Sequence, residues 1–488
     1  MFKAKFWKKG KAVDNFKKKD IPKLKYGVIH SQFGFSDGVS IVMKQVEEVL
    51  VKNLKIPEKN IFYLVGNSKE KSHHITENEL LWDRNKVNRL MIDSFSKGYG
   101  GYKSEKIEKA ISDAQKVITD FVNKNKIDVL FVHNSSHPIN FISSLALSRY
   151  YKHSIKHKRK TPKYILWWHD SHLERKMFSN PSSDVEEYLL EGVPGCSAEY
   201  IIFINKLQFK TAKDYFLKLD KRKKGYYEKI AMNNNVVHNT SGIYLGSFKE
   251  LESSKFNNKL KQFIQDFKIK ELFNEKDLKL NEALFCLQHT RIVKRKRIDF
   301  ALKYCYKLLD ELKKDQKYKA LYFLVSGQSG GLDGNKKKLI KLNKKLAKKY
   351  KRPNFFLVFA EDYENKTHIL FEEYPKIFAK LKGFSTYFSE VEGFGNNLLE
   401  VLASGLIPVI YKYPVFKSDV ENYHFQVVAL DKFEVDEKSI DETIEVLENQ
   451  DKRKEMIDKN LSILKKRLPH KIMAFKLVQA ITKKRLHG

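Results

Sequence analysis

The chain has 488 residues, enough for two or three domains, and its 42% hydrophobic and 13% aromatic content argues against a disordered chain. Its 93 Lys and Arg against 59 Asp and Glu give a formal net charge of +34, which favours an anionic partner or a lysine-rich solubilising surface. Three cysteines with no close pair argue against a disulfide scaffold and a Cys-based zinc site. We find no signal-peptide core and no apolar run of about 18 residues, so we expect a cytoplasmic protein.

The first half of the chain alternates short apolar runs with helical stretches. Residues 1–25 form a basic arm in which lysines are interleaved with aromatic residues, and a domain over 26–250 follows. Its first strand leads through a polar glycine loop (31–40) into a helix, which is the opening unit of a doubly wound α/β domain. The polar region 67–105 lacks clear periodicity and is predicted to be an insertion or lid. The strands predicted for this domain are 26–30, 61–65, 128–133, 164–168 and 199–204.

A second series of alternating elements covers residues 283–465, after an interdomain linker region at 251–282. Because strands that alternate with helices form parallel sheets, the sequence predicts two Rossmann-like doubly wound domains facing a central cleft. A C-terminal helix (466–488) follows, and its packing partner is not indicated. The strands predicted for the second domain are 283–289, 321–327, 354–360, 384–389 and 407–411.

The strongest local signal is the segment 389–410, with the sequence SEVEGFGNNLLEVLASGLIPVI. The pattern indicates that Glu392 ends a strand and that a helix begins near Asn396, which places Glu400 in its second turn. The glycine loop and the helix N-terminus form an anion site at the carboxyl edge of the sheet. Two acids beside such a site suit a nucleotide-sugar, because the acids can bind the sugar hydroxyls while the backbone amides bind the diphosphate. The alternative is an ordinary helix N-terminus with favourable acids.

This segment resembles the signature of retaining family-4 glycosyltransferases of the GT-B fold, which carry two glutamates in an E-x7-E motif. The resemblance extends to RIVKRK (291–296), which is similar to the Arg-x-x-x-x-Lys element of that family. It implies that Arg291 and Lys296 clamp the donor diphosphate and that Glu392 holds sugar hydroxyls. Arg297 stands where the family most often has glycine. The motif residues implied to bind the donor are Gly393, Phe394, Gly395, Asn396, Leu398 and Glu400.

Other landmarks of the family occur in the expected order. Gly327 matches a glycine turn at a strand end, and VVHN (236–239) resembles the strand end before the interdomain region. The loop from Gly34 to Gly38, with Val39, resembles the loop that closes over the donor phosphates. His169, in WWHDSH, matches the active-site histidine and would contact the donor sugar as a neutral imidazole.

The remaining histidines support weaker inferences. A histidine at a strand end more often caps or packs, and the H-x-x-H spacing of His169 and His172 lacks a third metal ligand. We therefore predict no metal site. His133 and His137, in HNSSHP, follow another strand and are candidates to contact the acceptor.

The resemblance implies a reaction in which a nucleotide-diphosphate sugar loses its diphosphate and the acceptor attacks on the same face. Cations and amides stabilise the leaving group, so neither a metal nor another cofactor nor a dedicated general base is required. A glycosidase with two free carboxylates is the contrasting hypothesis. It is rejected because Glu400 is placed within a helix behind a phosphate loop.

The acceptor is less determined than the donor. Basic clusters lie in the arm, at 152–163 and at 221–224, all in the acceptor-side domain, and the lysines and aromatic residues of the arm suit an anionic membrane face or the phosphates of nucleic acid. A fourth basic cluster, at 336–352, has the pattern of a solvated amphipathic helix. We rank a glycan or membrane-linked glycolipid acceptor first, since no nucleic-acid motif is present. The alternatives are modified DNA bases, a small anionic acceptor, and an inert basic binding module of GT-B fold. The sequence does not indicate the oligomeric state.

Overall fold

The computed structural model describes residues 15–35, 37–95, 97–98, 102–175, 178–192, 198–220, 234–238, 254–312, 317–329 and 335–485. The chain divides into two compact units. Unit 1 comprises Met1–Asn239 together with His470–Gly488, and unit 2 comprises Thr240–Pro469. Most of the predicted basic arm, the cluster at 221–224, and the start of the linker region lie outside the described residues.

Unit 1 contains a sheet of seven parallel strands in the order β3-β2-β1-β4-β5-β6-β7. The strand order reverses direction between β1 and β4, which are neighbours in space, and this is the switch point of a doubly wound sheet. The strands are β1 (Tyr26–Phe33), β2 (Ile61–Ser68), β3 (Ile75–Glu77), β4 (Val129–His133), β5 (Lys163–Trp168), β6 (Tyr200–Phe203) and β7 (Asn234–Val236).

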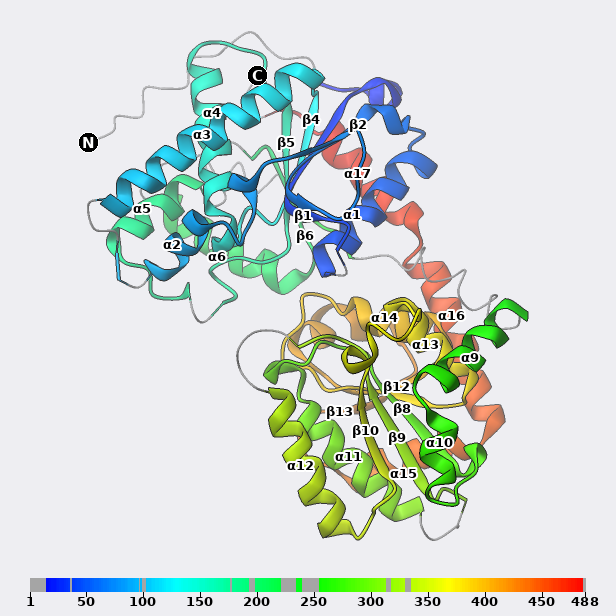
Figure 1. Ribbon diagram of the computed structural model, residues 1–488. Coiled ribbons are helices and arrows are strands. Elements are labelled where there is room, and N and C mark those ends of the chain that lie inside the picture. The colour runs from blue at the N-terminus through cyan, green and yellow to red at the C-terminus, as the bar shows by residue number, and fades with distance from the viewer. Residues whose placement is uncertain are drawn as a thin grey trace. The chain divides into compact units, whose positions relative to one another are not determined.

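Helices cover both faces of this sheet because strands buried on both sides carry apolar residues that point alternately to each face. One core lies under α2 (Lys86–Asp93), α3 (Tyr102–Asn125), α4 (Phe141–Lys156), α5 (Ser183–Gly192) and α6 (Lys206–Asp220). The other core lies under α1 (Gly38–Glu48) and α17 (His470–Thr482). Figure 1 shows α17, in red, beside α1 and away from α3 and α4.

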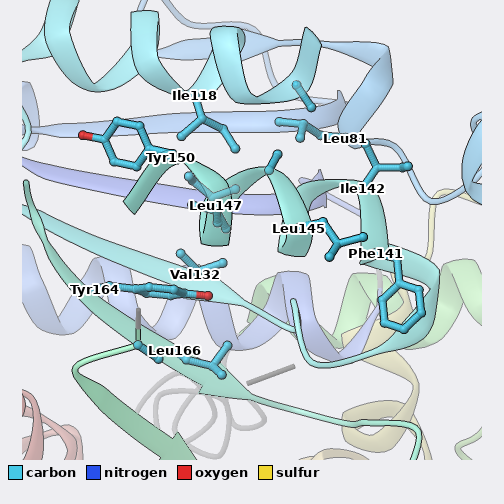
Figure 2. Close-up of a cluster of buried hydrophobic side chains, with 14 of the residues drawn as sticks. Leu81, Ile118, Val132, Phe141, Ile142, Leu145, Leu147, Tyr150, Tyr164 and Leu166 are labelled. Carbon is cyan, nitrogen blue, oxygen red and sulfur yellow. The ribbon is translucent and has the colours of Figure 1, made fainter. Parts of the chain in front are cut away.

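Helix α4 is the centre of the first core. Leu145 and Leu147 of α4 lie between Ile118 of α3 and the strand residues Val132 and Leu166 (Figure 2). All five side chains are buried, at 1% exposure or less. At roughly 1.5–3 kcal/mol for each fully buried aliphatic side chain, such layers stabilise the sheet that carries the site.

Unit 2 has a sheet of six parallel strands in the order β10-β9-β8-β11-β12-β13. In chain order this is 3-2-1-4-5-6, with the switch point between β8 and β11. The strands are β8 (Ala283–Gln288), β9 (Ala320–Val325), β10 (Phe355–Phe359), β11 (Phe384–Tyr387), β12 (Ile407–Tyr411) and β13 (Val428–Leu430).

Three clusters of buried residues hold the helices of unit 2 to its sheet. One lies under α11 (Ile298–Glu311), α12 (Asn335–Tyr350) and α15 (Glu437–Glu448). The opposite face packs on α9 (Ser254–Asp266), α10 (Ile269–Asn274) and α13 (Tyr374–Lys380). The third cluster joins α14 (Asn396–Ala403) and α16 (Gln450–Arg467) to β12.

The predicted fold class, two Rossmann-like doubly wound α/β domains, is confirmed, and ten of the strands lie where apolar runs predicted them. The segment 67–105, predicted as an insertion or lid, contributes the edge strand β3 and helix α2, and it buries Leu81 and Met91 in the core. The C-terminal helix, which had no assigned partner, packs on unit 1 as α17. The three-residue strands β3 and β13 were not predicted, because such short runs carry no readable alternation, whereas β7 ends at Val236, where VVHN resembled a strand end.

Candidate active site

The switch point of each sheet gathers the loops that carry the candidate residues. In unit 2 the loop after β8 contains Arg291 and Lys296, and the loop after β11 contains Glu392. Parallel strands end at the same edge, and ligands bind there because the flanking loops diverge at the switch point. The prediction that Glu392 ends a strand is wrong, since β11 ends at Tyr387 and Glu392 lies five residues later, in the loop.

Lys296, which is buried, forms an ion pair with Glu392, whose side chain is 10% exposed, and Nζ of the lysine lies against Oε1 of the glutamate. Arg295 reinforces the pair: its Nη1 lies 3.5 Å from Oε2 of Glu392 and donates a 2.5 Å hydrogen bond to the carbonyl of Val391. Burial raises the pKa of Glu392, but the charges of Lys296 and Arg295 outweigh it and lower the pKa to about 2. Glu392 is therefore ionised at any physiological pH.

Glu400 is held by a histidine that the sequence analysis did not select. Oε2 of Glu400, in the second turn of α14, lies 2.7 Å from Nε2 of His289 at the end of β8. The other ring nitrogen of His289 lies 2.8 Å from the hydroxyl of Ser326, and its ring stacks on Phe371 at 4.1 Å. Asn397 of α14 donates a 2.6 Å bond to the carbonyl of His289, so the helix and strand end are joined twice.

The glycine loop between the two acids has a fixed backbone. Gly395 adopts φ 113°, and a side chain there would meet the hydroxyl oxygen of Tyr413 at 2.4 Å, so only glycine fits. Tyr413, which is fully buried on the loop after β12, donates a 2.8 Å hydrogen bond to the carbonyl of Phe394. As predicted, α14 begins at Asn396, and Leu398 is buried beneath it with its amide bonded to the carbonyl of Gly395.

Arg297 stands in a backbone conformation that favours glycine. Its φ of 47° and ψ of 44° are left-handed, which explains why the resembling family most often has glycine at this position. The side chain compensates through bonds of its guanidinium to Asp299 at 3.1 Å and Glu390 at 3.0 Å, and it lies 4.4 Å from the ring centroid of Phe433. Arg297 thereby fixes the start of α11 and the end of the cation loop.

Arg291 and Gly327 flank the same loop. Arg291 is exposed, and its charge acts on the buried ammonium of Lys296, so the two predicted cations lie near one another. A side chain at Gly327 would meet the carbonyl oxygen of Thr290 at 2.4 Å, so glycine allows the loops after β8 and β9 to approach. The described residues of unit 2 thus bring together Arg291, Lys296, Glu392 and Glu400 at one sheet edge.

In unit 1 two predicted histidines, His133 and His169, form a buried chain at its switch point together with His30, which was not predicted. Nδ1 of His30, on β1, donates a 3.0 Å bond to the carbonyl of His133, at the end of β4. Nδ1 of His133 lies 3.0 Å from Nε2 of His169, which follows β5. Burial lowers the pKa of His169 to about 3, with repulsion from His30 in the same direction, and burial lowers that of His133 well below its usual value. The implied neutral imidazole at His169 is consistent with these shifts.

The other predicted residues of unit 1 have structural partners. His137 accepts a bond from the amide of Ile139 at 3.2 Å, and burial lowers its pKa to about 3. Gly34 adopts φ 77°, and Gly38 begins α1. The amide of Val39 is engaged by the carboxylate of Asp37 at 3.0 Å, which caps α1. The segment 236–239 is described only to residue 238.

The sequence analysis missed the residues that hold the acids and the loop: Arg295, His289, Ser326 and Tyr413. His289 carried a usable signal, because a polar residue at the carboxyl end of a buried parallel strand faces the ligand edge. Tyr413 carried none, since its contact depends on how the loop after β12 folds. In the part of the chain that the structure describes, no three histidine, cysteine or acidic side chains lie close enough to hold a metal ion.

Comparison with known proteins identifies the kind of enzyme. Residues 269–462 match the family described as Glycosyl transferases group 1. The chain is similar to two mannosylglucosylglycerate synthases: that of Petrotoga mobilis, 25% identical over 83% of this chain and 86% of that protein, and that of Thermotoga maritima, 24% identical over 83% and 85%.

Solved structures share the fold. One of them, described as trehalose-6-phosphate from E. coli bound with UDP-2-fluoro glucose, matches 94% of this chain and 99% of its own with a TM-score of 0.62 and 10% identity. At that identity the likeness concerns the fold alone. Residues 269–462 are a group 1 glycosyltransferase domain, and the protein is a glycosyltransferase of the GT-B type.

Proposed function

We propose that the protein transfers a sugar, with retention at the anomeric carbon and without a metal, from a nucleotide-diphosphate sugar to a hydroxyl of a small sugar acid. The observation that carries the donor half is the largely buried Lys296–Glu392 pair, flanked by Arg295 and the glycine loop at the switch point of unit 2. The residue roles that the family resemblance implied for the donor are part of this proposal.

In the proposed reaction the bond between the anomeric carbon and the diphosphate oxygen breaks as the acceptor oxygen forms the new bond. The acceptor proton passes to a diphosphate oxygen, and a nucleoside diphosphate leaves. Lys296 and Arg291 stabilise the negative charge that develops on the diphosphate. Glu392, kept ionised by its two cations, accepts hydrogen bonds from sugar hydroxyls, and Glu400, oriented by His289, accepts them from the ribose.

The relatives support a small anionic acceptor. Both named proteins are synthases of mannosylglucosylglycerate, and each aligns with 83% of this chain. The sequence alone ranked a glycan or membrane-linked acceptor first, and we now place the sugar acid ahead of it. Of the helices that the structure describes, none is both long enough and apolar enough to span a membrane.

The donor half is tested by a screen of UDP-, GDP- and ADP-sugars with mass-spectrometric detection of the released nucleoside diphosphate. We expect Glu392→Ala and Lys296→Ala to lower turnover by about 10²-fold or more while the circular dichroism spectrum is unchanged. Lys294→Ala is the matched control, since Lys294 is an exposed lysine of the same loop. Turnover like that of the wild type in both active-site variants would overturn the assignment.

The acceptor half is tested by comparing glucosylglycerate with glucosylglycerol, which has the same size but no carboxylate. We expect transfer to the acid only, and NMR of the product should show the anomeric configuration of the donor. Transfer only to a lipid-linked glycan would restore the first-ranked acceptor of the sequence analysis. An inverted product would refute retention while leaving donor binding intact.

A further inference from the structure

The histidine chain of unit 1 contains one ring that cannot itself reach a ligand. Nε2 of His133 is fully buried and has no hydrogen-bond partner among the described residues, and Nδ1 faces His169. The whole side chain is 1% exposed, and its ring stacks on Trp167 at 5.2 Å. A role in touching the acceptor, which the sequence suggested for His133, would leave these contacts unexplained.

His169 is held from two sides. Its Nε2 is bonded by His133 at 3.0 Å, and its carbonyl accepts a 2.8 Å bond from the side-chain amide of Gln208 on α6. The remaining ring nitrogen, Nδ1, has no hydrogen-bond partner in the described part of the chain. One ring nitrogen and the backbone carbonyl of His169 are therefore engaged within the protein, and the other ring nitrogen is left to bind a substrate.

Only one proton lies between the two facing nitrogens, because burial keeps both rings uncharged. If His169 donated, His133 would carry its proton on the buried Nε2, where no acceptor is found among the described residues. Orphaned N–H groups are rarer in protein interiors than orphaned acceptors, because a buried donor without a partner loses its full hydration. The arrangement in which His133 donates avoids this.

We propose that His133 is a positioning residue, whose protonated Nδ1 donates to Nε2 of His169 and thereby leaves the proton of His169 on Nδ1. His30 completes the support, since it donates to the carbonyl of His133 and joins β1 to β4 at the switch point. In this state His169 presents an N–H donor to an oxygen of the bound sugar. The inference rests on the proposed function only for the identity of that ligand.

The direct test is the proton position, read in the full-length protein labelled with ¹⁵N-histidine. Long-range ¹H–¹⁵N correlation spectra distinguish protonated from bare ring nitrogens, and the signals that vanish in His169→Gln assign that ring. We expect Nδ1 of His169 to be protonated and Nε2 to be bare. The reverse pattern would overturn the proposal whether or not the protein turns over a nucleotide-sugar.

The functional test compares two substitutions at one position. His133→Asn keeps a donor near the place of Nδ1, whereas His133→Phe keeps the stacked ring but removes the hydrogen bond. At metal sites the partner that orients a histidine is worth about 10–100-fold in activity, and we expect a loss of similar size here. His133→Phe should therefore lower kcat by about that factor with little change in the donor KM, and His133→Asn should restore most of it. In His133→Phe the signals of His169 should also shift to a mixture of proton positions.

His172→Phe is the control, because His172 is a buried neighbour that packs edge-on against Tyr215 and has no part in the chain of histidines. It should leave kcat and the His169 signals unchanged. Wild-type kcat in His133→Phe, or equal losses in His133→Phe and His133→Asn, would refute a positioning role. If His133→Phe fails to fold, the wild-type spectrum and His133→Asn still decide the question.

Discussion

At the scale of single residues, the candidate site concentrates charges and backbone conformations that are costly anywhere else. The side chains of Lys296 and Glu392 are only 7% and 10% exposed, and each is tolerable because the other compensates its charge. Gly395 and Arg297 both occupy left-handed backbone conformations in the two loops that carry these charges. Such outliers persist where the surrounding structure enforces them, and here they fix the acid and the cation relative to the sheet edge.

Arg297 allows the backbone cost to be separated from the side-chain contacts. Arg297→Gly and Arg297→Ala lose the same bonds to Asp299 and Glu390, but only alanine keeps the left-handed strain. We therefore expect the glycine variant to be more stable than the alanine variant by about 1 kcal/mol. Urea unfolding of the two variants measures the difference, and equal midpoints would show that the loop relaxes when the guanidinium is absent.

At the scale of elements, the C-terminal segment is anchored to unit 1 by buried polar contacts. Nζ of Lys163, on β5, donates to the carbonyl of Ile481 at 2.9 Å and also to that of Lys483, so it caps the end of α17. The guanidinium of Arg485 bonds both carboxylate oxygens of Glu199, with Nη2 to Oε1 at 2.6 Å, and their side chains are 2% and 0% exposed. Contacts between residues more than 280 positions apart thus hold α17 against unit 1.

This anchor predicts a large effect from a small change. Glu199→Gln keeps the shape but leaves the charge of Arg485 buried without a counter-ion, so we expect a loss of about 3–5 kcal/mol in the free energy of unfolding. Hydrogen exchange in α17 should accelerate. Lys160→Ala is the control, because the Lys160 side chain is 73% exposed and the loss of its 3.3 Å pair with Asp128 should cost less than about 1 kcal/mol. A cost below that of the control would mean that Arg485 finds another partner.

At the scale of the whole molecule, the buried histidines tie stability to pH. Burial lowers the pKa of His30 and, further, of His133, and it lowers that of His137 and His169 to about 3 and that of His172 to about 4, against an ordinary 6.5. Between those values the unfolded chain binds protons that the folded chain does not. The contribution of these histidines to the free energy of unfolding is therefore fully present above pH 6.5, and it decreases as the pH falls toward 3.

The expected loss is steep, since each neutral ring contributes about 1.4 kcal/mol per pH unit well below 6.5. We expect the urea midpoint of the full chain to fall between pH 7.5 and 5.5, before carboxylates titrate, and we expect Glu392 to stay ionised throughout this range because its pKa is about 2. In His172→Phe the number of protons taken up on unfolding should fall by about one, so stability should change less steeply with pH. A midpoint that does not change with pH would show that these rings bind protons in the folded state.

The sequence by itself determined the order of the elements, the fold class, and the helix that carries Glu400, because periodicity and glycine spacing are local properties. It placed Glu392 at a strand end, whereas in the structure this residue lies in the loop after β11. It could not determine the partners of those groups. Lys296 and Glu392 are 96 residues apart, His289 and Glu400 are 111 apart, and His133 and His169 meet only because β4 and β5 pair. The tertiary structure alone decided that α17 packs on unit 1 and that Arg297 serves where glycine is usual. These contacts depend on which strands become neighbours at the switch points, and strand order is fixed by the packing of the whole domain rather than by any short segment.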